Sequence, residues 1–178
     1  MARLCGWLAL SALLPIHLAG QPATTAAQPS RTEMLAAGRD VMQKARYCTF
    51  VTIGSDGHPQ ARIVDPLAPD AGFVSFIATN PLSRKVKELE RDSRATLSCF
   101  DAASSSYVTL IGKGTIVTDA AEKVRRWKEE WTPFYPGGAT GPAVTLIRLA
   151  PIRLELVSVS RGLVGDPTTW RPLTIDFP

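Results

Sequence analysis

The sequence is divided into short strand-like runs separated by tight polar connections, and this division restricts the fold more than any other feature. The runs cover residues 47–53, 60–64, 73–78, 95–100, 107–117 and 143–159. They are rich in β-branched and aromatic residues, and the first connection carries Asp56-Gly57, a favoured pair where a turn needs positive φ. We therefore predict a mainly β (α+β) fold, an antiparallel barrel of about six strands rather than a doubly wound sheet.

Two or three helices are expected to flank the strands. In residues 31–46 apolar side chains recur at helical spacing, which is typical of core packing. A second helical pattern covers residues 84–91 and ends near Asp92. Within the last strand-like run, Pro151 indicates an edge strand or a bulge, because proline cannot donate a hydrogen bond to a neighbouring strand.

Aromatic residues gather where the third predicted helix ends. This helix begins after the N-cap Asp119 and extends to about residue 130, with Trp127 and Trp131 on its apolar side. The loop 131–142 that follows is rich in proline and glycine. Aromatic residues in such a loop either wall a pocket or pin the loop to the core, and we favour the pocket wall.

The first 27 residues have the features of a signal peptide. Arg3 supplies a positive start, residues 8–14 form an apolar run, and small residues follow at 19–20. The apolar run is too short to cross a bilayer, so a transmembrane anchor is the less favoured alternative. We therefore expect export of the chain, into a periplasm or out of the cell, without a stable membrane anchor.

Charge and histidine content exclude two classes of function. The 20 lysines and arginines less Arg3 of the leader leave 19 against 16 acidic residues, a net charge of +3. This charge is too small and too scattered to suggest nucleic-acid binding. The only histidines are His17, in the leader, and His58, in a predicted turn where we expect it to be solvated. A histidine-rich metal site is therefore excluded, and haem ligation would depend on His58 or on a non-histidine ligand.

After the leader we divide the chain into a linker (28–33), one domain (34–160) and a C-terminal tail (161–178). An exported protein can form disulfides, and Cys48 and Cys99 remain in the mature chain. Both lie in strand-like runs, where a cysteine is more often a small buried hydrophobe than half of a bridge. We therefore predict two unbridged cysteines, with a disulfide as the alternative.

The segment after Asn80-Pro81 has the features of an anion-binding site. Ser83 stands at the N-cap position of the following helix, whose free N–H groups and partial positive charge suit an anion. Arg84 and Lys85 are unfavourable at that end of a helix, and a bound phosphate or other anion would resolve the conflict. The alternative interpretation is a solvated basic turn.

Arg62 is a second candidate site residue, because it is a charged residue within a strand whose other residues are suited to burial. A charge in such a place needs a partner. Within the chain, that partner would be Asp65 or Asp56, through a salt bridge.

Taken in chain order, these segments resemble the flavin-binding split-barrel family, whose best-known member is pyridoxamine 5'-phosphate oxidase. The resemblance covers about residues 35 to 160 and rests on the segments 49–53, 56–59, 62–64, 78–80, 83–85, 94–98 and 107–114. Residues 131–138 are similar to the general stress protein branch rather than to the true oxidase. The resemblance implies an antiparallel split β-barrel of about six strands and a homodimer that binds FMN between its subunits. A site between subunits agrees with the size of the barrel, whose own side chains fill it.

The resemblance also implies a set of cofactor-binding residues. The set is Arg62, Val64, Thr79, Ser83, Arg84, Lys85 and Tyr107. In this set Ser83, Arg84 and Lys85 would hold the flavin phosphate. Arg62 and Thr79 would place the ring and the ribityl chain.

Three departures from the oxidase pattern concern the ring contact, the phosphate site and the substrate-binding tail. Tyr107 stands where the oxidase has a polar amide residue near the flavin, so it either contacts the ring or fills the barrel. Leu67 stands where the oxidase has a lysine. The tail 161–178 lacks the histidine that true oxidases pair with an arginine to bind substrate. The resemblance therefore supports flavin binding more than it supports the oxidase's own reaction.

Three functions follow as hypotheses. The first is a flavin-dependent oxidoreductase of the stress-protein type with an unknown small substrate. The second is a non-catalytic module that binds flavin, haem or another anionic ligand. The third is a structural dimer with a vestigial site. The sequence identifies no general acid, base or nucleophile.

Overall fold

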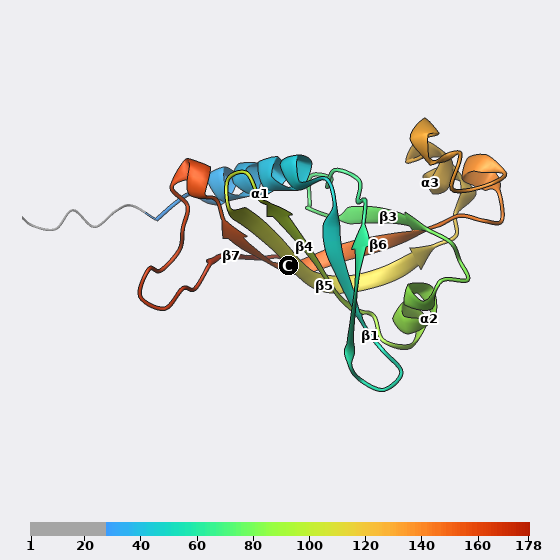
Figure 1. Cartoon of the computed structure of the whole chain (residues 1–178), viewed down its shortest axis with the longest axis horizontal. Coiled ribbons are helices and arrows are strands. Elements are labelled where there is room, and N and C mark those ends of the chain that lie inside the picture. The colour runs from blue at the N-terminus through green and yellow to red at the C-terminus, as the bar shows by residue number, and fades with distance from the viewer. Residues whose placement is uncertain (1–27) are drawn as a thin grey trace, which may run out of the picture.

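A curled sheet of seven antiparallel strands forms the body of the protein, and its structure, a computed structural model, describes residues 28–178 (Figure 1). The strands are β1 (Cys48–Ile53), β2 (Pro59–Val64), β3 (Ser75–Thr79), β4 (Arg94–Asp101), β5 (Ser106–Val117), β6 (Thr145–Val157) and β7 (Leu173–Asp176). Their order is β2-β1-β4-β5-β6-β3, and β7 pairs with the second half of β6. The predicted antiparallel split barrel is confirmed. The signal peptide predicted for residues 1–27 lies outside the described residues.

Three α-helices flank the sheet. They are α1 (Arg31–Ala45), α2 (Arg84–Arg91) and α3 (Ala120–Arg125), and α1 lies over β4 and β5 (Figure 1). Ser30 and Glu33 form a capping box at the start of α1, so residues 31–33 of the predicted linker are helical. None of the helices in the described part of the chain is long and apolar enough to cross a membrane.

The third helix is shorter than predicted. Lys128 is extended, with φ −115° and ψ 130°, and a short 3-10 turn, η1 (Glu129–Trp131), follows it. The rings of Trp127, Trp131 and Tyr135 pack edge to face, with centroids 5.7–6.5 Å apart. Because aromatic packing of this kind outweighs the small differences in helix propensity, the chain leaves the helix to build this cluster.

The core lies between the inner face of the sheet and α1. Its largest fully buried side chains include Phe50, Leu97, Leu110 and Leu154, which come from four neighbouring strands. Burying each of them contributes about 1.5–3 kcal/mol. This continuous apolar layer fixes the strands on whose ends the candidate site is built.

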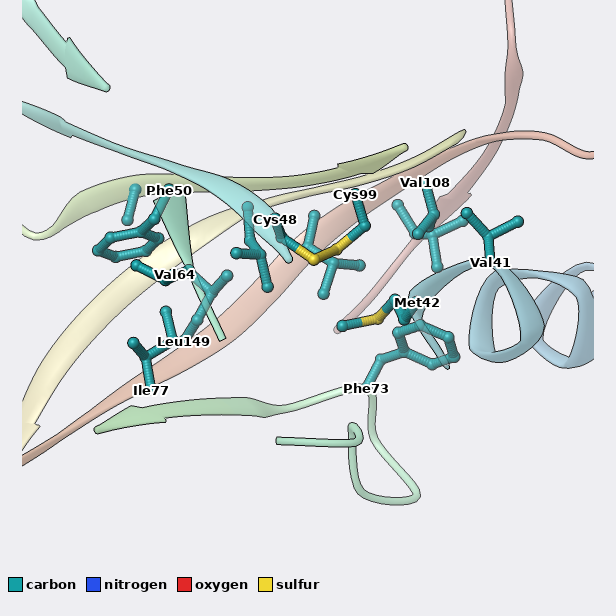
Figure 2. Close-up of a cluster of buried hydrophobic side chains, with 14 of the residues drawn as sticks. Val41, Met42, Cys48, Phe50, Val64, Phe73, Ile77, Cys99, Val108 and Leu149 are labelled. Carbon is teal, nitrogen blue, oxygen red and sulfur yellow. A yellow bond between two sulfur atoms is a disulfide. The ribbon is translucent and has the colours of Figure 1, made fainter. Parts of the chain in front are cut away.

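Cys48 and Cys99 form a disulfide, so the prediction of two unbridged cysteines was wrong (Figure 2). The two residues are direct partners in the β1–β4 ladder, with Cα atoms 4.3 Å apart, and both are buried. Direct partners at this distance have side chains close enough to bridge. The register that brings the two cysteines together is a property of the paired strands and is not visible in either strand alone.

Pro151 lies at a bulge, one of the two predicted alternatives. The β5–β6 register shifts between Ile111, which pairs with Arg153, and Gly112, which pairs with Pro151. Strand β6 is not an edge, because β5, β3 and β7 all pair with it. The extra residue of the bulge, Ile152, bends β6, whose first half pairs with β3 and whose second half pairs with β7.

Candidate functional site

A cavity of about 470 Å³ opens where β2 and β3 end, beside the first turn of α2. Its lining comprises Arg46, Tyr47, Ile63, Val64, Asp65, Ala78, Thr79, Lys85, Glu130, Trp131, Phe134 and Tyr135. We call it the first cavity. Val64, Thr79 and Lys85 of the predicted cofactor-binding set line it.

The turn between β3 and α2 places the polar side of the first cavity. The Asn80 side chain accepts a hydrogen bond from the Leu82 amide at 2.8 Å, which closes the turn after the strand. Ser83 then occupies the predicted N-cap position, but its hydroxyl makes no capping bond and lies 3.1 Å from the Thr79 hydroxyl. The first N–H groups of α2 therefore have no side-chain acceptor.

Lys85 stands in that first turn as a half-buried cation. Burial lowers the pKa of its ammonium, and the positive charge of Arg62 lowers it further. The first turn of α2 carries no acidic residue. A positive side chain, a helix N-terminus and uncapped N–H groups thus meet at one wall of the first cavity, an arrangement suited to an anion.

Arg62 has a protein partner that was not foreseen. Glu88 of α2, only 3% exposed, accepts hydrogen bonds from Arg62 at 2.7 Å and from the Thr52 hydroxyl at 2.5 Å. The salt-bridge partner of Arg62 is therefore neither Asp65 nor Asp56. Burial raises the pKa of Glu88, but the bonds from Thr52 and Arg62 outweigh it and the pKa is lowered overall.

Arg84 and Tyr107, like Arg62 and Ser83, do not line the first cavity. Arg84 pairs with Glu88 at 3.0 Å, is mostly exposed, and faces a separate hollow that also includes Lys87 and Arg91. Tyr107 is in β5, opposite Phe100 on one side and Val157 on the other. Within one chain, therefore, the structure brings six of the seven predicted residues to the β2–β3–α2 region and leaves only Tyr107 outside it. Of these six, Val64, Thr79 and Lys85 line the first cavity.

The loop after α3 supplies the aromatic wall of the first cavity, as expected. Trp131 is 5% exposed and therefore also anchors the loop, whereas Phe134 is 75% exposed. Burial raises the pKa of the Tyr135 hydroxyl, so this side chain stays neutral. Arg46 and Tyr47 were missed by sequence reasoning, because a helix end before a strand gives no signal of a pocket.

The curled antiparallel sheet and an anion-suited cavity at its strand ends define a split-barrel protein. The family described as pyridoxamine 5'-phosphate oxidase matches residues 34–158, and the chain belongs to this family. No curated protein matches the chain significantly.

Several solved structures share the fold. A protein from Clostridium acetobutylicum related to general stress protein 26 is 19% identical with a TM-score of 0.68, over 81% of this chain and 94% of that one. General stress protein 26 from Bacillus anthracis is 17% identical with a TM-score of 0.64, over 80% and 97%. A pyridoxamine 5'-phosphate oxidase-related, FMN-binding protein from Nostoc punctiforme is 15% identical with a TM-score of 0.53, over 83% and 94%. At these identities the likeness concerns the fold.

Proposed function

We propose that the first cavity binds FMN and that the protein is a flavin-dependent oxidoreductase acting on a small molecule. The observation that carries this proposal is the wall formed by Lys85 and the uncapped start of α2, where a half-buried cation has a lowered pKa. A phosphate there would neutralise Lys85 and accept from the free N–H groups. The FMN-binding relative from Nostoc punctiforme supports the choice of flavin.

The residues of the first cavity suit the parts of FMN. Lys85 and the α2 N-terminus, with Ser83 and Thr79, would hold the phosphate, and Val64 with the aromatic wall would face the apolar ring. FMN, when bound, supplies hydride or electron transfer chemistry. The chain's own residues bind and orient it, and the Trp131–Tyr135 wall keeps water from one side of the cavity.

The first experiment is a titration of residues 28–178 with FMN, FAD and riboflavin, followed by flavin fluorescence. Micromolar or tighter binding of FMN that is lost with riboflavin supports the phosphate wall. The absence of saturable binding by all three would overturn the proposal. Reduction of the bound flavin by NAD(P)H or by a deazaflavin then separates an oxidoreductase from a module that only stores flavin.

We also propose that the protein is a homodimer with the cofactor between its subunits. Tyr47, Ile63 and Phe100 are each more than half exposed. Ile63 and Phe100 adjoin the inward-facing Val64 and Cys99 in their strands, so they lie on the outer face of the sheet. Tyr47 immediately precedes β1. Tyr47 and Ile63 also line the first cavity, so a second copy on this face would close the cavity from outside.

Export remains the proposed route of this chain. The disulfide supports it, because such bonds persist in oxidising compartments and are rare in reducing ones. A split barrel carrying both a leader-like segment and a buried disulfide is therefore proposed to work in a periplasm or outside the cell.

A further inference from the structure

A second cavity of about 450 Å³ lies beside the first cavity. It is formed by the last turns of α1, the segment 65–69 that follows β2, and Lys128. Arg46 and Asp65 line both cavities, so the two share a wall. No residue of the predicted cofactor-binding set lines the second cavity.

The lining of the second cavity combines apolar side chains with cations. Met42, Pro66 and Leu67 give the apolar surface. Three cations, Arg39, Arg46 and Lys128, line the cavity together with one acidic residue, Asp65. The Lys128 ammonium is 4.0 Å from an Asp65 oxygen and 3.8 Å from an oxygen of Glu130, which is not part of the lining. Among residues 28–178, no carboxylate lies within 4.0 Å of the guanidinium of Arg39 or Arg46. The cavity therefore has an excess of positive charge.

Arg39 is a lining residue of the second cavity that is held in place by several contacts. Its guanidinium donates to the carbonyl oxygens of Pro69 and Asp70 and lies 4.6 Å from the centre of the Phe73 ring. These contacts tie the loop after β2 to α1 without neutralising the charge. The positive charge is thus held in place before any ligand arrives.

Arg46 is held between the two cavities by strained backbone. Its φ of 54° and ψ of −59°, with the Tyr47 amide donating to the Ala45 carbonyl, make a classic γ-turn, a rare and strained conformation. A non-glycine residue in such a turn is more common at functional sites than elsewhere. The turn sets the Arg46 guanidinium 5.2 Å from the centre of the Tyr47 ring, at the shared wall.

We propose that the second cavity binds an apolar organic carboxylate. Met42, Pro66 and Leu67 would contact its hydrocarbon or aromatic body, and Arg46 and Lys128 would bind its carboxylate. A ligand held there would lie against the first cavity, so amphipathic organic acids are the substrate class of the proposed oxidoreductase. The assignment of these acids as substrates rests on the proposed function, whereas their binding in the second cavity does not.

The test is calorimetric titration of the flavin-free chain, residues 28–178, with 2-naphthoate and with its neutral analogue 2-naphthamide. We expect the carboxylate to bind at least about fivefold more tightly than the amide, because only the carboxylate has a charge for Arg46 and Lys128. Lys128→Gln should remove most of that difference. Lys87→Gln, which removes an exposed cation outside both cavities, should leave it unchanged. Equal affinity for acid and amide, or no saturable binding of the acid, would overturn the inference.

One further variant tests the role of Arg46 directly. Arg46→Gly suits the positive φ, so it should fold at least as well as the wild type while it loses the preference for the carboxylate. If Arg46→Gly retains the preference, Arg46 is not a ligand and the inference fails.

FMN titrations of the same proteins separate this inference from the proposed function. Lys85→Ala should lose FMN and keep naphthoate, and Lys128→Gln should show the reverse. Naphthoate binding without FMN binding overturns the proposed function alone. FMN binding without naphthoate binding overturns the second site alone.

Discussion

Glu88 shows how a single buried carboxylate can organise a cationic surface. It receives Arg62 from β2 and Arg84 from its own helix, and the hydroxyl of Thr52 satisfies it further. A buried charge persists only when it is paired and hydrogen-bonded. Glu88 therefore fixes α2 against the first hairpin and sets the direction of two arginines near the first cavity.

Replacing Glu88 by alanine is expected to lower the free energy of unfolding by about 2–3 kcal/mol. The change leaves the Arg62 guanidinium, 18% exposed, without its carboxylate. Urea unfolding of Glu88→Ala measures the loss. The matched control is Glu90→Ala, which removes an exposed carboxylate from the same helix and should change stability by less than about 0.5 kcal/mol. Similar losses of unfolding free energy in Glu88→Ala and Glu90→Ala would contradict this role of Glu88.

Lys85 and Arg84 are adjacent in sequence but are expected to differ in flavin binding. Lys85→Ala should weaken FMN at least about tenfold, because a charge-assisted contact contributes about 1.5–3 kcal/mol. Arg84 is turned toward Glu88 and does not line the first cavity, so Arg84→Ala should weaken FMN less than about threefold. Fluorescence titration of the two variants checks the ranking. A larger loss in Arg84→Ala would remove Lys85 from the phosphate site.

The lowered pKa of Lys85 also predicts a pH dependence of FMN affinity. The ammonium binds phosphate only while protonated, and burial brings its pKa below the ordinary value of 10.5. Affinity should therefore decline as the pH rises toward the lowered pKa of Lys85, in a range above the second phosphate pKa of about 6, where the phosphate stays doubly charged. Lys85→Arg should abolish the decline, because a guanidinium does not titrate there. The same decline in Lys85→Arg would assign it to another group.

At the scale of single residues, part of the candidate site could be predicted from the sequence and part could not. Asn80-Pro81 and the basic residues after it indicated the cationic wall of the first cavity, because a chain break and an N-cap are local signals. Glu88 was missed because a glutamate in a charged helix looks solvated, and only packing against β1 reveals its burial. Arg46 was missed because no local pattern predicts a γ-turn.

At the scale of elements, the bulge between β5 and β6 depends on a glycine. A Cβ added to Gly112 would overlap the Ala150 carbonyl oxygen and come within 2.8 Å of the Pro151 Cα. Both atoms belong to the backbone of β6, so neither can move without disturbing the longest strand pair in the sheet. The close approach explains why a residue without a side chain stands there.

Gly112→Ala is therefore expected to destabilise the fold by about 2–3 kcal/mol or more, since overpacking of this kind displaces backbone. Thermal or urea unfolding measures the effect. Gly72→Ala is the control, because an added Cβ there meets nothing closer than 3.8 Å and the backbone has no positive φ. A Gly112→Ala protein as stable as the Gly72→Ala protein would show that the bulge can relax.

Most elements could be predicted because strands and helices carry their own periodic signals. The main strands and the first two helices agree with the predicted ranges to within about two residues, the usual uncertainty of element ends. β7 was missed because it is four residues long and buries only Ile175, too few for a pattern. The end of α3 was predicted too far along the chain, because the packing of aromatic side chains determines where this helix ends. Registers such as Cys48 opposite Cys99 appear only once strands pair.

At the scale of the whole molecule, the outer sheet face is predicted to hold two copies together. Phe100→Asp places a charge on this face and should convert dimers to monomers, because a buried charge without a partner opposes association. Sedimentation equilibrium measures the mass. The control Leu82→Asp changes an exposed apolar residue outside the sheet and should leave the mass unaltered. A wild-type chain that is monomeric at high concentration would contradict the proposed dimer.

The disulfide also changes what a protease could do to this molecule. It closes a covalent loop between residues separated by 51 positions, and every predicted cofactor residue except Tyr107 lies inside it. A cut in the exposed turn at residues 70–72 would leave Cys48 on one fragment and Cys99 on the other, still joined. A nicked molecule would therefore keep both fragments, and with them the predicted site, until a reductant separates them.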